Sequence, residues 1–309
     1  MTEHVLAVDI GGTKMVAGLV DGEGVVLRSA TTPTPAGPGE ERVWRALLDL
    51  IHRLEPAGAL ACGVGCAGPM TGGGATVSPL NIAGWREFPL LPRLESVLDM
   101  PVCVDGDAKA LALGEGWRGA ARGSRDYLAL VVSTGIGGGL VVDGRLLDGH
   151  DGNAGHLGHV IVVPEGALCA CGSHGCLEAE ASGTALLRRT GRPAQYAEAA
   201  EVVRSGRLLG LALASTVALL DLELVAVGGS VALGFGVPFF DACREEFTRS
   251  ARIAHARGAR IVPVGLGRDA PLIGAAAVAW RLLGRDVLAS RGHTGATAGE
   301  VSGRGDRVS

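Results

Sequence analysis

The most constraining feature of this sequence is a group of cysteines within residues 155–178, GHLGHVIVVPEGALCACGSHGCLE. Cys169, Cys171 and Cys176 have the spacing C-x-C-x4-C, and His159 lies ten residues before the first of them. Thiolate and imidazole are preferred zinc ligands, and a closed structural zinc site takes four ligands in a tetrahedron. The spacing therefore predicts a zinc site formed by these four residues. The alternative is a set of buried thiols without a metal.

Glycines within the same stretch agree with a metal-binding loop. Gly172 and Gly175 stand where a chain folding tightly around an ion needs backbone angles that other residues tolerate poorly. A disulfide explains the pattern less well, because three clustered cysteines leave one unpaired. Since structural zinc is worth on the order of 10 kcal/mol, the loop should be rigid. We therefore expect its flanking residues, His156 and Glu178, to contact substrate.

Bulk properties define a broad class. A chain of 309 residues suits two domains, and 47% hydrophobic residues indicate a globular protein. The formal net charge of -4 disfavours a nucleic-acid-binding surface, so we expect no nucleic-acid partner. The sequence shows neither an uninterrupted run of about eighteen apolar residues nor the order of a signal peptide. We expect a cytoplasmic protein with no membrane partner.

A glycine turn follows the first apolar run. Asp9-Ile10-Gly11-Gly12-Thr13-Lys14 places two glycines, a hydroxyl and an ammonium beside a carboxylate. Backbone N–H groups in such a turn can hold a phosphate, Thr13 and Lys14 can add donors, and Asp9 can hold Mg²⁺ through water. A plain hairpin turn explains the same residues about as well.

Two further glycine turns follow later strands. Ser133-Thr134-Gly135-Ile136-Gly137-Gly138-Gly139 separates two apolar runs, and Gly228-Gly229-Ser230 ends another. Hydroxyls and glycines between strands make the first of these a second candidate phosphate loop. Two such loops about 120 residues apart are stronger evidence for nucleotide binding than either alone.

Two polar residues in loops are candidates for chemistry. Asp107 lies where a strand over residues 101–104 gives way to a helix, a position that carries function in α/β folds but also suits a helix cap. Local evidence slightly favours the cap. Asn81 lies in a turn-rich stretch, where it could bind a ligand or cap its own turn.

The order of the apolar patterns predicts two α/β lobes with a cleft between them. We expect helices over residues 40–55, 90–98, 108–117, 185–189, 196–205, 208–220, 235–252 and 272–283. Cys62 and Cys66 fall in a predicted buried strand and are interpreted as core residues. The stretch 285–309 lacks periodicity and is predicted to be disordered.

Taken together, these motifs resemble the ROK family of repressors and kinases over residues 5–283. The most specific match is the zinc stretch, where GHxxV and CxCGxxGCxE stand almost intact. The first two glycine turns resemble the family's phosphate motifs, and the third resembles the turn beside the adenosine. The resemblance implies an actin-like (ribonuclease H-like) ATPase fold that closes over ATP and a sugar.

The resemblance also implies roles for single residues. Val104-Asp-Gly-Asp107-Ala-Lys-Ala matches the family segment V-E-N-D-A-N-A-A, whose aspartate takes the proton from the sugar 6-hydroxyl. Asp107 is therefore the expected catalytic base, and His159 is expected to hold zinc and touch the sugar. The expected substrate-binding residues are Asn81, Gly106, Asp107, His156, His159 and Glu178. The expected nucleotide-binding residues are Asp9, Gly11, Gly12, Thr13, Lys14, Thr134, Gly135, Gly137, Gly138, Gly228 and Gly229.

Two positions depart from the family pattern. Gly106 replaces an asparagine that reaches the sugar's 3- and 4-hydroxyls, and His156 replaces a glutamate and occurs in bacterial N-acetylmannosamine kinases. A missing amide and a histidine change the hydrogen bonding offered to the sugar. The expected activity is ATP-dependent phosphorylation of the 6-hydroxyl of a hexose or amino-hexose, such as kanosamine or N-acetylmannosamine, with Mg²⁺ and structural Zn²⁺. A cyclitol kinase is an alternative.

Other function classes fit less well. Family repressors carry a helix-turn-helix ahead of the first phosphate motif, whereas Asp9 stands close to the first residue of this sequence. A sugar-binding protein without catalysis is disfavoured by the retention of Asp107 and both phosphate loops. We expect lobes at 1–118, completed by a helix over 272–284, and at 119–271. The resemblance also implies a homodimer.

Overall fold

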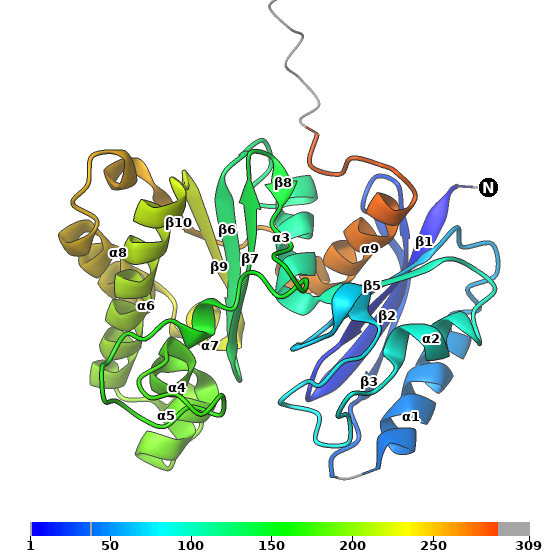
Figure 1. Cartoon of the computed structure of the whole chain (residues 1–309), viewed down its shortest axis with the longest axis horizontal. Coiled ribbons are helices and arrows are strands. Elements are labelled where there is room, and N and C mark those ends of the chain that lie inside the picture. The colour runs from blue at the N-terminus through cyan, green and yellow to red at the C-terminus, as the bar shows by residue number, and fades with distance from the viewer. Residues whose placement is uncertain (1, 38, 290–309) are drawn as a thin grey trace, which may run out of the picture.

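The first lobe is built on a sheet of five strands (Figure 1). The computed structural model describes residues 2–37 and 39–289. The sheet order is β3-β2-β1-β4-β5, with β2 antiparallel to β1 and β3, and with β4 parallel to β1 and β5. The strands are β1 (His4–Ile10), β2 (Lys14–Asp21), β3 (Val26–Pro33), β4 (Cys62–Cys66) and β5 (Val102–Gly106).

The second lobe repeats this pattern in the order β10-β9-β6-β7-β8. A meander of β6, β7 and β8 is followed by β9 parallel to β6, and by β10 parallel to β9. The strands are β6 (Tyr127–Val132), β7 (Ile136–Val142), β8 (Arg145–Leu146), β9 (Leu224–Gly228) and β10 (Arg260–Pro263). The two sheets therefore share one topology, as expected for duplicated lobes.

Two helices lie between the sheets and pack on each other (Figure 1). The helix α3 (Asp107–Arg118) packs against β6 and β7, and α9 (Ala270–Leu282) packs against β1 and β4. Their crossing is close, because a Cβ on Gly274 would lie 2.6 Å from the Ala110 carbonyl oxygen. Apolar residues of both helices and both sheets form one continuous core here. The lobes are thus joined through a packed centre.

The remaining helices cover the outer sides of the sheets. In the first lobe, α1 (Glu40–His52) packs on β2 and β3, and α2 (Leu90–Glu95) packs on β5. The second lobe has α6 (Ala199–Leu220) along α8 (Val237–Ser250), and the shorter helices α4 (Leu177–Ala181), α5 (Gly183–Thr190) and α7 (Ser230–Phe235). Cys62 and Cys66 are fully buried in β4, which confirms their interpretation as core residues.

The division of residues 196–220 and 235–252 into helices differs from the sequence predictions. The stretches 196–205 and 208–220 are joined in α6, because Gly206 serves helix packing and does not break the helix. A Cβ on Gly206 would lie 2.4 Å from the Phe239 carbonyl oxygen of α8. The stretch 235–252 is interrupted at its start by Gly236, whose φ of 60° separates α7 from α8.

By length and composition, α6 is the described helix that is apolar enough to cross a membrane. Half of its most apolar window, 50%, is buried inside the protein, where α6 packs along α8. The core helix of a globular protein meets the same criterion. Of the stretch predicted to be disordered, residues 290–309 lie outside the described residues. Arg285 is placed, and its Nη1 donates to the Gly22 carbonyl at 2.8 Å.

Candidate functional site

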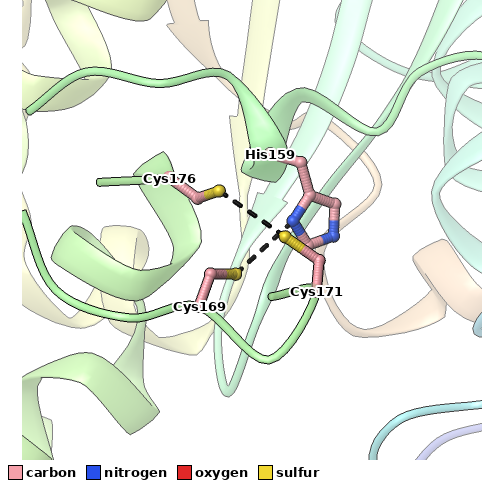
Figure 2. A group of neighbouring side chains, drawn as sticks. All are labelled: His159, Cys169, Cys171 and Cys176. Carbon is pink, nitrogen blue, oxygen red and sulfur yellow. Dashed lines mark hydrogen bonds between the residues drawn. The ribbon is translucent and has the colours of Figure 1, made fainter. Parts of the chain in front are cut away.

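The three cysteines and the histidine of the predicted zinc site come together in the second lobe (Figure 2). Their ligand atoms all lie within 4.8 Å of one another. The Sγ of Cys169 is 3.6 Å from His159 Nδ1, and the Sγ atoms of Cys171 and Cys176 are 3.7 Å apart. A tetrahedron with zinc–sulfur bonds of about 2.3 Å has sulfur–sulfur edges of about 3.8 Å. We call these four residues the Cys3His cluster, and their spacing fits the ion.

Local chemistry agrees with this arrangement. Gly172 and Gly175 have φ values of 91° and 70°, as the tight loop requires. A Cβ on Gly175 would lie 1.6 Å from the Val163 carbonyl oxygen. Burial raises the pKa of the Cys176 thiol to about 12, whereas the backbone N–H of Ser173 lowers the pKa of Cys171. A bound cation would displace these thiol protons.

The helix α4 connects the Cys3His cluster to the second glycine turn. Glu178 stands in its first turn, two residues after Cys176. The Oε2 atom of Glu178 accepts a hydrogen bond from the backbone N–H of Ile136 at 2.7 Å. The Glu178 Oε2 also lies 2.6 Å from the place a Cβ on Gly135 would occupy. The loop of the Cys3His cluster and the candidate phosphate loop are therefore held together by this carboxylate.

The first glycine turn is the hairpin between β1 and β2. The N–H of Gly11 donates to the Lys14 carbonyl at 3.1 Å, so the turn is closed by its own backbone. Asn81 lies directly against this turn, because a Cβ on Gly12 would be 2.7 Å from the Asn81 side chain. The alternative that Asn81 caps its own turn finds no support within the described residues, where no such hydrogen bond occurs. Asn81 and the first turn thus form one surface.

The second and third glycine turns share one edge of the second sheet. Val131 pairs with Gly228 in the parallel β6–β9 ladder, so both strands end at this edge. The Oγ atoms of Ser133 and Ser230 are 2.9 Å apart. Gly229 has a φ of 94°, and a Cβ there would lie 2.2 Å from the Val132 carbonyl oxygen. Two separate glycine turns therefore meet at this edge of the sheet.

Two glycines of the second candidate phosphate loop lie within the sheet. Gly137 and Gly138 belong to β7 and pair with Val131 and Leu130 of β6. The N–H of Gly138 donates to the Gly155 carbonyl at 3.0 Å. Because this N–H already has a partner, Thr134 and Gly135 are the residues of the turn better placed to offer donors to a ligand.

Two carboxylates flank Gly65 at the carboxyl edge of the first sheet. Asp9 pairs with Gly65 in the parallel β1–β4 ladder. A Cβ on Gly65 would lie 3.4 Å from Asp9 Oδ1 and 3.6 Å from the Asp107 Cα. Burial, followed by the charge of Asp107, raises the pKa of Asp9 to about 7. Two carboxylates in such surroundings indicate a site for a cation or for proton transfer.

Asp107 is the first residue of α3 rather than a side-chain cap. The N-cap position is Gly106, and no side chain caps the helix. The Oδ1 atom of Asp107 accepts from its neighbour Ala108 N–H at 2.8 Å. Surrounding protein raises the pKa of Asp107, although the residue remains open to solvent. A solvent-accessible carboxylate with a raised pKa suits a general base.

His156 belongs to the second lobe and lies close enough to Asp107 to feel its charge. Its ring stacks on that of His159 with centroids 5.9 Å apart. The ring also lies 3.6 Å from the position of a Cβ on Gly68, which follows β4 in the first lobe. Burial lowers the pKa of His156, and the charges of Asp107 and Glu178 oppose this shift. The imidazole therefore stands among the expected sugar contacts.

Lys109 forms a buried ion-pair group that the sequence analysis missed. Its Nζ lies 2.8 Å from Asp105 Oδ1, 2.7 Å from Asp148 Oδ1 and 3.2 Å from the Gly152 carbonyl. The three ammonium donors are thus all used. The signal was present in the sequence, because Lys109 stands where the family segment V-E-N-D-A-N has its second asparagine.

Asn153 makes a second missed contact across the site. Its Nδ2 donates to the Met70 carbonyl at 2.9 Å, and its Oδ1 accepts from the Met70 N–H at 3.2 Å. A loop of the second lobe is therefore fixed to the loop after β4 on the first. The contact spans 83 residues, so local sequence patterns cannot reveal it.

The raised pKa of Asp9 predicts a pH dependence of stability. The folded protein holds a proton on Asp9 between its ordinary value of 3.8 and about 7, whereas the unfolded chain does not. This contribution is fully present below pH 3.8 and is lost as pH rises towards 7. We expect Asp9→Asn to flatten the fall in unfolding free energy over this range. Urea unfolding of both proteins without Mg²⁺ or nucleotide measures the two slopes, and equal slopes would refute the assignment.

Two solved structures that share this architecture are sugar kinases. A ROK hexokinase from Thermus thermophilus is 36% identical with a TM-score of 0.77, covering 91% of this chain and 99% of that one. A ROK glucokinase from Streptomyces griseus, in complex with glucose and AMPPNP, is 33% identical with a TM-score of 0.79, covering 90% and 99%. The fold and site define an ATP-dependent sugar kinase of the actin-like ATPase fold, built in two lobes.

The chain belongs to the ROK family, whose sequence model matches residues 5–281. A curated relative, the N-acetylmannosamine kinase of Escherichia fergusonii, is 36% identical over 248 residues, which are 75% of this chain and 84% of that protein. The predicted family and fold are therefore confirmed, and so is the kinase class of the enzyme.

Proposed function

We propose that this kinase transfers the γ-phosphoryl group of ATP to the 6-hydroxyl of a hexose or amino-hexose, with Asp107 as the base. The observation that carries the proposal is the position of Asp107 at the carboxyl edge of the first sheet, beside Asp9 across Gly65. Phosphoryl transfer needs an alcohol oriented by a base and charge neutralisation around the phosphates. Asp107 would accept the hydroxyl proton as the oxygen attacks.

In this proposal, the glycine turns supply the hydrogen-bond donors that hold the phosphates of ATP. Gly11 and Gly12 with Thr13 and Lys14 would act from the first lobe, and Thr134 and Gly135 from the second. Gly228 and Gly229 would lie beside the adenosine, since their turn adjoins Ser133. Mg²⁺ would be held by Asp9 through water and would neutralise phosphate charge.

We propose that the Cys3His cluster binds a structural zinc ion. The four donors and their mutual distances support this assignment. The ion would fix the ring of His159, whose Nδ1 faces Cys169 and whose other nitrogen is left for a sugar hydroxyl. Asn81, Asp107, His156 and Glu178 would contact the same sugar.

Space beside Gly106 supports altered sugar recognition. A Cβ there would meet nothing closer than the Lys109 Cδ at 3.6 Å, so the place of the family asparagine is open. Lys109 directs all its donors to Asp105, Asp148 and Gly152, and Asp148 stays 56% exposed. The carboxylate oxygens of Asp105 and Asp148 beside this open space favour a sugar substituent that donates hydrogen bonds, such as an amine. An N-acylated 2-amino sugar and a 3-amino sugar such as kanosamine fit this description.

Restoring the family amide is expected to shift preference towards glucose. We expect Gly106→Asn to raise kcat/KM for glucose relative to kanosamine by about 10-fold, because one well-placed hydrogen bond is worth about 1.5 kcal/mol. The measurement is kcat/KM with ATP for glucose, kanosamine, N-acetylmannosamine and a cyclitol in both proteins. A wild type that prefers glucose over every amino sugar would overturn the altered-recognition proposal. It would leave the kinase assignment intact.

We also propose how the chain divides into lobes, where the protein is located and how it assembles. The packing of α9 on β1 and β4 supports a first lobe of residues 1–118 completed by 272–284, with 119–271 as the second. None of the seven cysteines, all of which lie within the described residues, forms a disulfide, and this supports a cytoplasmic location. We also propose a homodimer, as the family resemblance implies, and sedimentation equilibrium tests it.

A further inference from the structure

The chain passes between the two sheets at two places, and these connections touch each other. Residues 119–126 lead from α3 to β6, and residues 264–269 lead from β10 back to α9. They meet at Gly119 and Gly265. A Cβ on Gly265 would lie 2.7 Å from Ala120 N and 3.2 Å from Gly119 Cα. Any rotation of one lobe against the other must be taken up at this meeting point.

One buried carboxylate binds both connections. Glu115, in the last turn of α3, is 0% exposed. It accepts hydrogen bonds from Ala120 N at 2.7 Å, Gly265 N at 2.9 Å and Leu266 N at 3.2 Å. These partners are all backbone N–H groups. A buried charge is costly unless it is hydrogen-bonded, and hydrogen bonds to a carboxylate are strong. The Glu115 carboxylate therefore holds both connections to α3. Apolar packing alone would not need a buried charge at this position.

We propose that Glu115 is the positioning residue of the interlobe hinge. Its carboxylate holds the two connections together, so that the lobes close as rigid units about the α3–α9 crossing. The helix α3 carries Asp107 at its other end, about 12 Å away along the axis. Near that end, the Cβ of Ala108 lies 3.3 Å from the place of a Cβ on Gly137. Glu115 therefore fixes the orientation of α3 relative to the second lobe. This orientation determines how the second glycine turn approaches Asp107.

The neutral variant Glu115→Gln tests this role. Its amide keeps the size of the side chain but turns one acceptor into a donor facing N–H groups. We expect kcat per folded molecule to fall about 10- to 100-fold at saturating MgATP and sugar, because small misplacements of reacting groups are costly. The sugar used is whichever of glucose, N-acetylmannosamine and kanosamine gives the wild type its highest kcat/KM. We also expect the wild type to contract in X-ray scattering when that sugar and AMPPNP bind, and the variant to contract less.

A matched control separates positioning from stability. Glu246 on α8 is also buried, but its partners Arg249 and Ser250 belong to its own helix and not to either connection. We expect Glu246→Gln to lose stability while keeping the wild-type kcat and contraction. If Glu115→Gln does not fold, Gly119→Ala displaces the carboxylate from the other side, since the Cβ would lie 2.2 Å from Glu115 Oε2.

The proposal requires that one folded variant shows both a lower kcat and a smaller contraction than the wild type. A fall in kcat without reduced contraction, or the reverse, overturns it. So does a variant that matches the wild type in both, or a wild type that does not contract. Failure of both Glu115→Gln and Gly119→Ala to fold would show a purely structural role. None of these outcomes bears on which sugar is the substrate, so failure here is distinct from failure of the proposed specificity.

Discussion

Replacing Asp107 with asparagine is expected to lower kcat by about 10²- to 10⁴-fold, the usual contribution of a general base. Asparagine keeps the shape and the acceptor for the Ala108 N–H at 2.8 Å, so α3 should begin unchanged. It cannot take a proton from an alcohol. The KM for sugar should change little, because the amide can still hydrogen-bond a hydroxyl.

The comparison needs a control that removes an equal charge elsewhere. Asp143 lies at the exposed β7–β8 turn and pairs with Arg125. Asp143→Asn should leave kcat unchanged, so the effect of Asp107→Asn is not one of net charge. Near-normal turnover in Asp107→Asn, with the same melting temperature as the wild type, would remove Asp107 from the role of base.

The raised pKa of Asp107 adds a second signature. The largest cause is the protein that surrounds the carboxyl group on its inner side, which raises this pKa above the ordinary value of 3.8 for aspartate. The base acts in its charged form, so kcat/KM should fall as pH drops through this raised pKa. The free energy of unfolding changes in the opposite direction. A carboxyl group with a raised pKa stabilises the folded protein at low pH, and this contribution is lost as pH rises. Activity and stability should therefore diverge in mildly acidic solution.

Loss of the metal ligands is expected to have the next largest effect. Cys176→Ser should reduce bound zinc from about one ion per chain to almost none, since the site needs four ligands. If removal of zinc costs about 5 kcal/mol, Tm falls by roughly 10 to 20 °C. The KM for sugar should rise, because His159 and Glu178 lose the support of the Cys3His cluster. Metal analysis, thermal unfolding and sugar titration measure the three effects.

Cys243 provides the matched control for that experiment. Its thiol is also 0% exposed, but it lies in the α6–α8 core away from the cluster. Cys243→Ser should keep its zinc and its sugar affinity, although an unpaired buried hydroxyl costs some stability. Chelated wild-type protein with unchanged melting temperature and unchanged sugar affinity would contradict the structural role of zinc.

Features encoded in short stretches were predictable from the sequence. The Cys3His cluster and the glycine turns follow from spacing within about twenty residues or from turns that only glycine allows. The packing of Asn81 on Gly12, the bond from Ile136 to Glu178 and the pairing of Asn153 with Met70 join distant segments. Such contacts depend on how the lobes assemble, which no local pattern specifies.

Two differences between the sequence predictions and the structure involve glycines. A glycine in a sequence indicates either freedom of the backbone or close approach of a neighbour, and only the structure distinguishes them. Gly206 falls between the helices predicted over 196–205 and 208–220, whereas in the structure it lies inside α6 and lets α8 approach. Gly138 was predicted to bind phosphate, whereas in the structure its N–H donates to the Gly155 carbonyl. In contrast, Gly172 and Gly175 were predicted to need unusual backbone angles, and both have positive φ.

The most direct test of the central claim is the position of the new phosphate and its dependence on Asp107. ATP is supplied with each hexose of the panel, and ¹H–³¹P correlation spectroscopy identifies the phosphorylated carbon. We expect phosphate on C6 alone, no transfer to a 6-deoxy analogue, and a rate at least about 10²-fold lower in Asp107→Asn. Phosphate on another carbon, or equal rates in the two proteins, would contradict it.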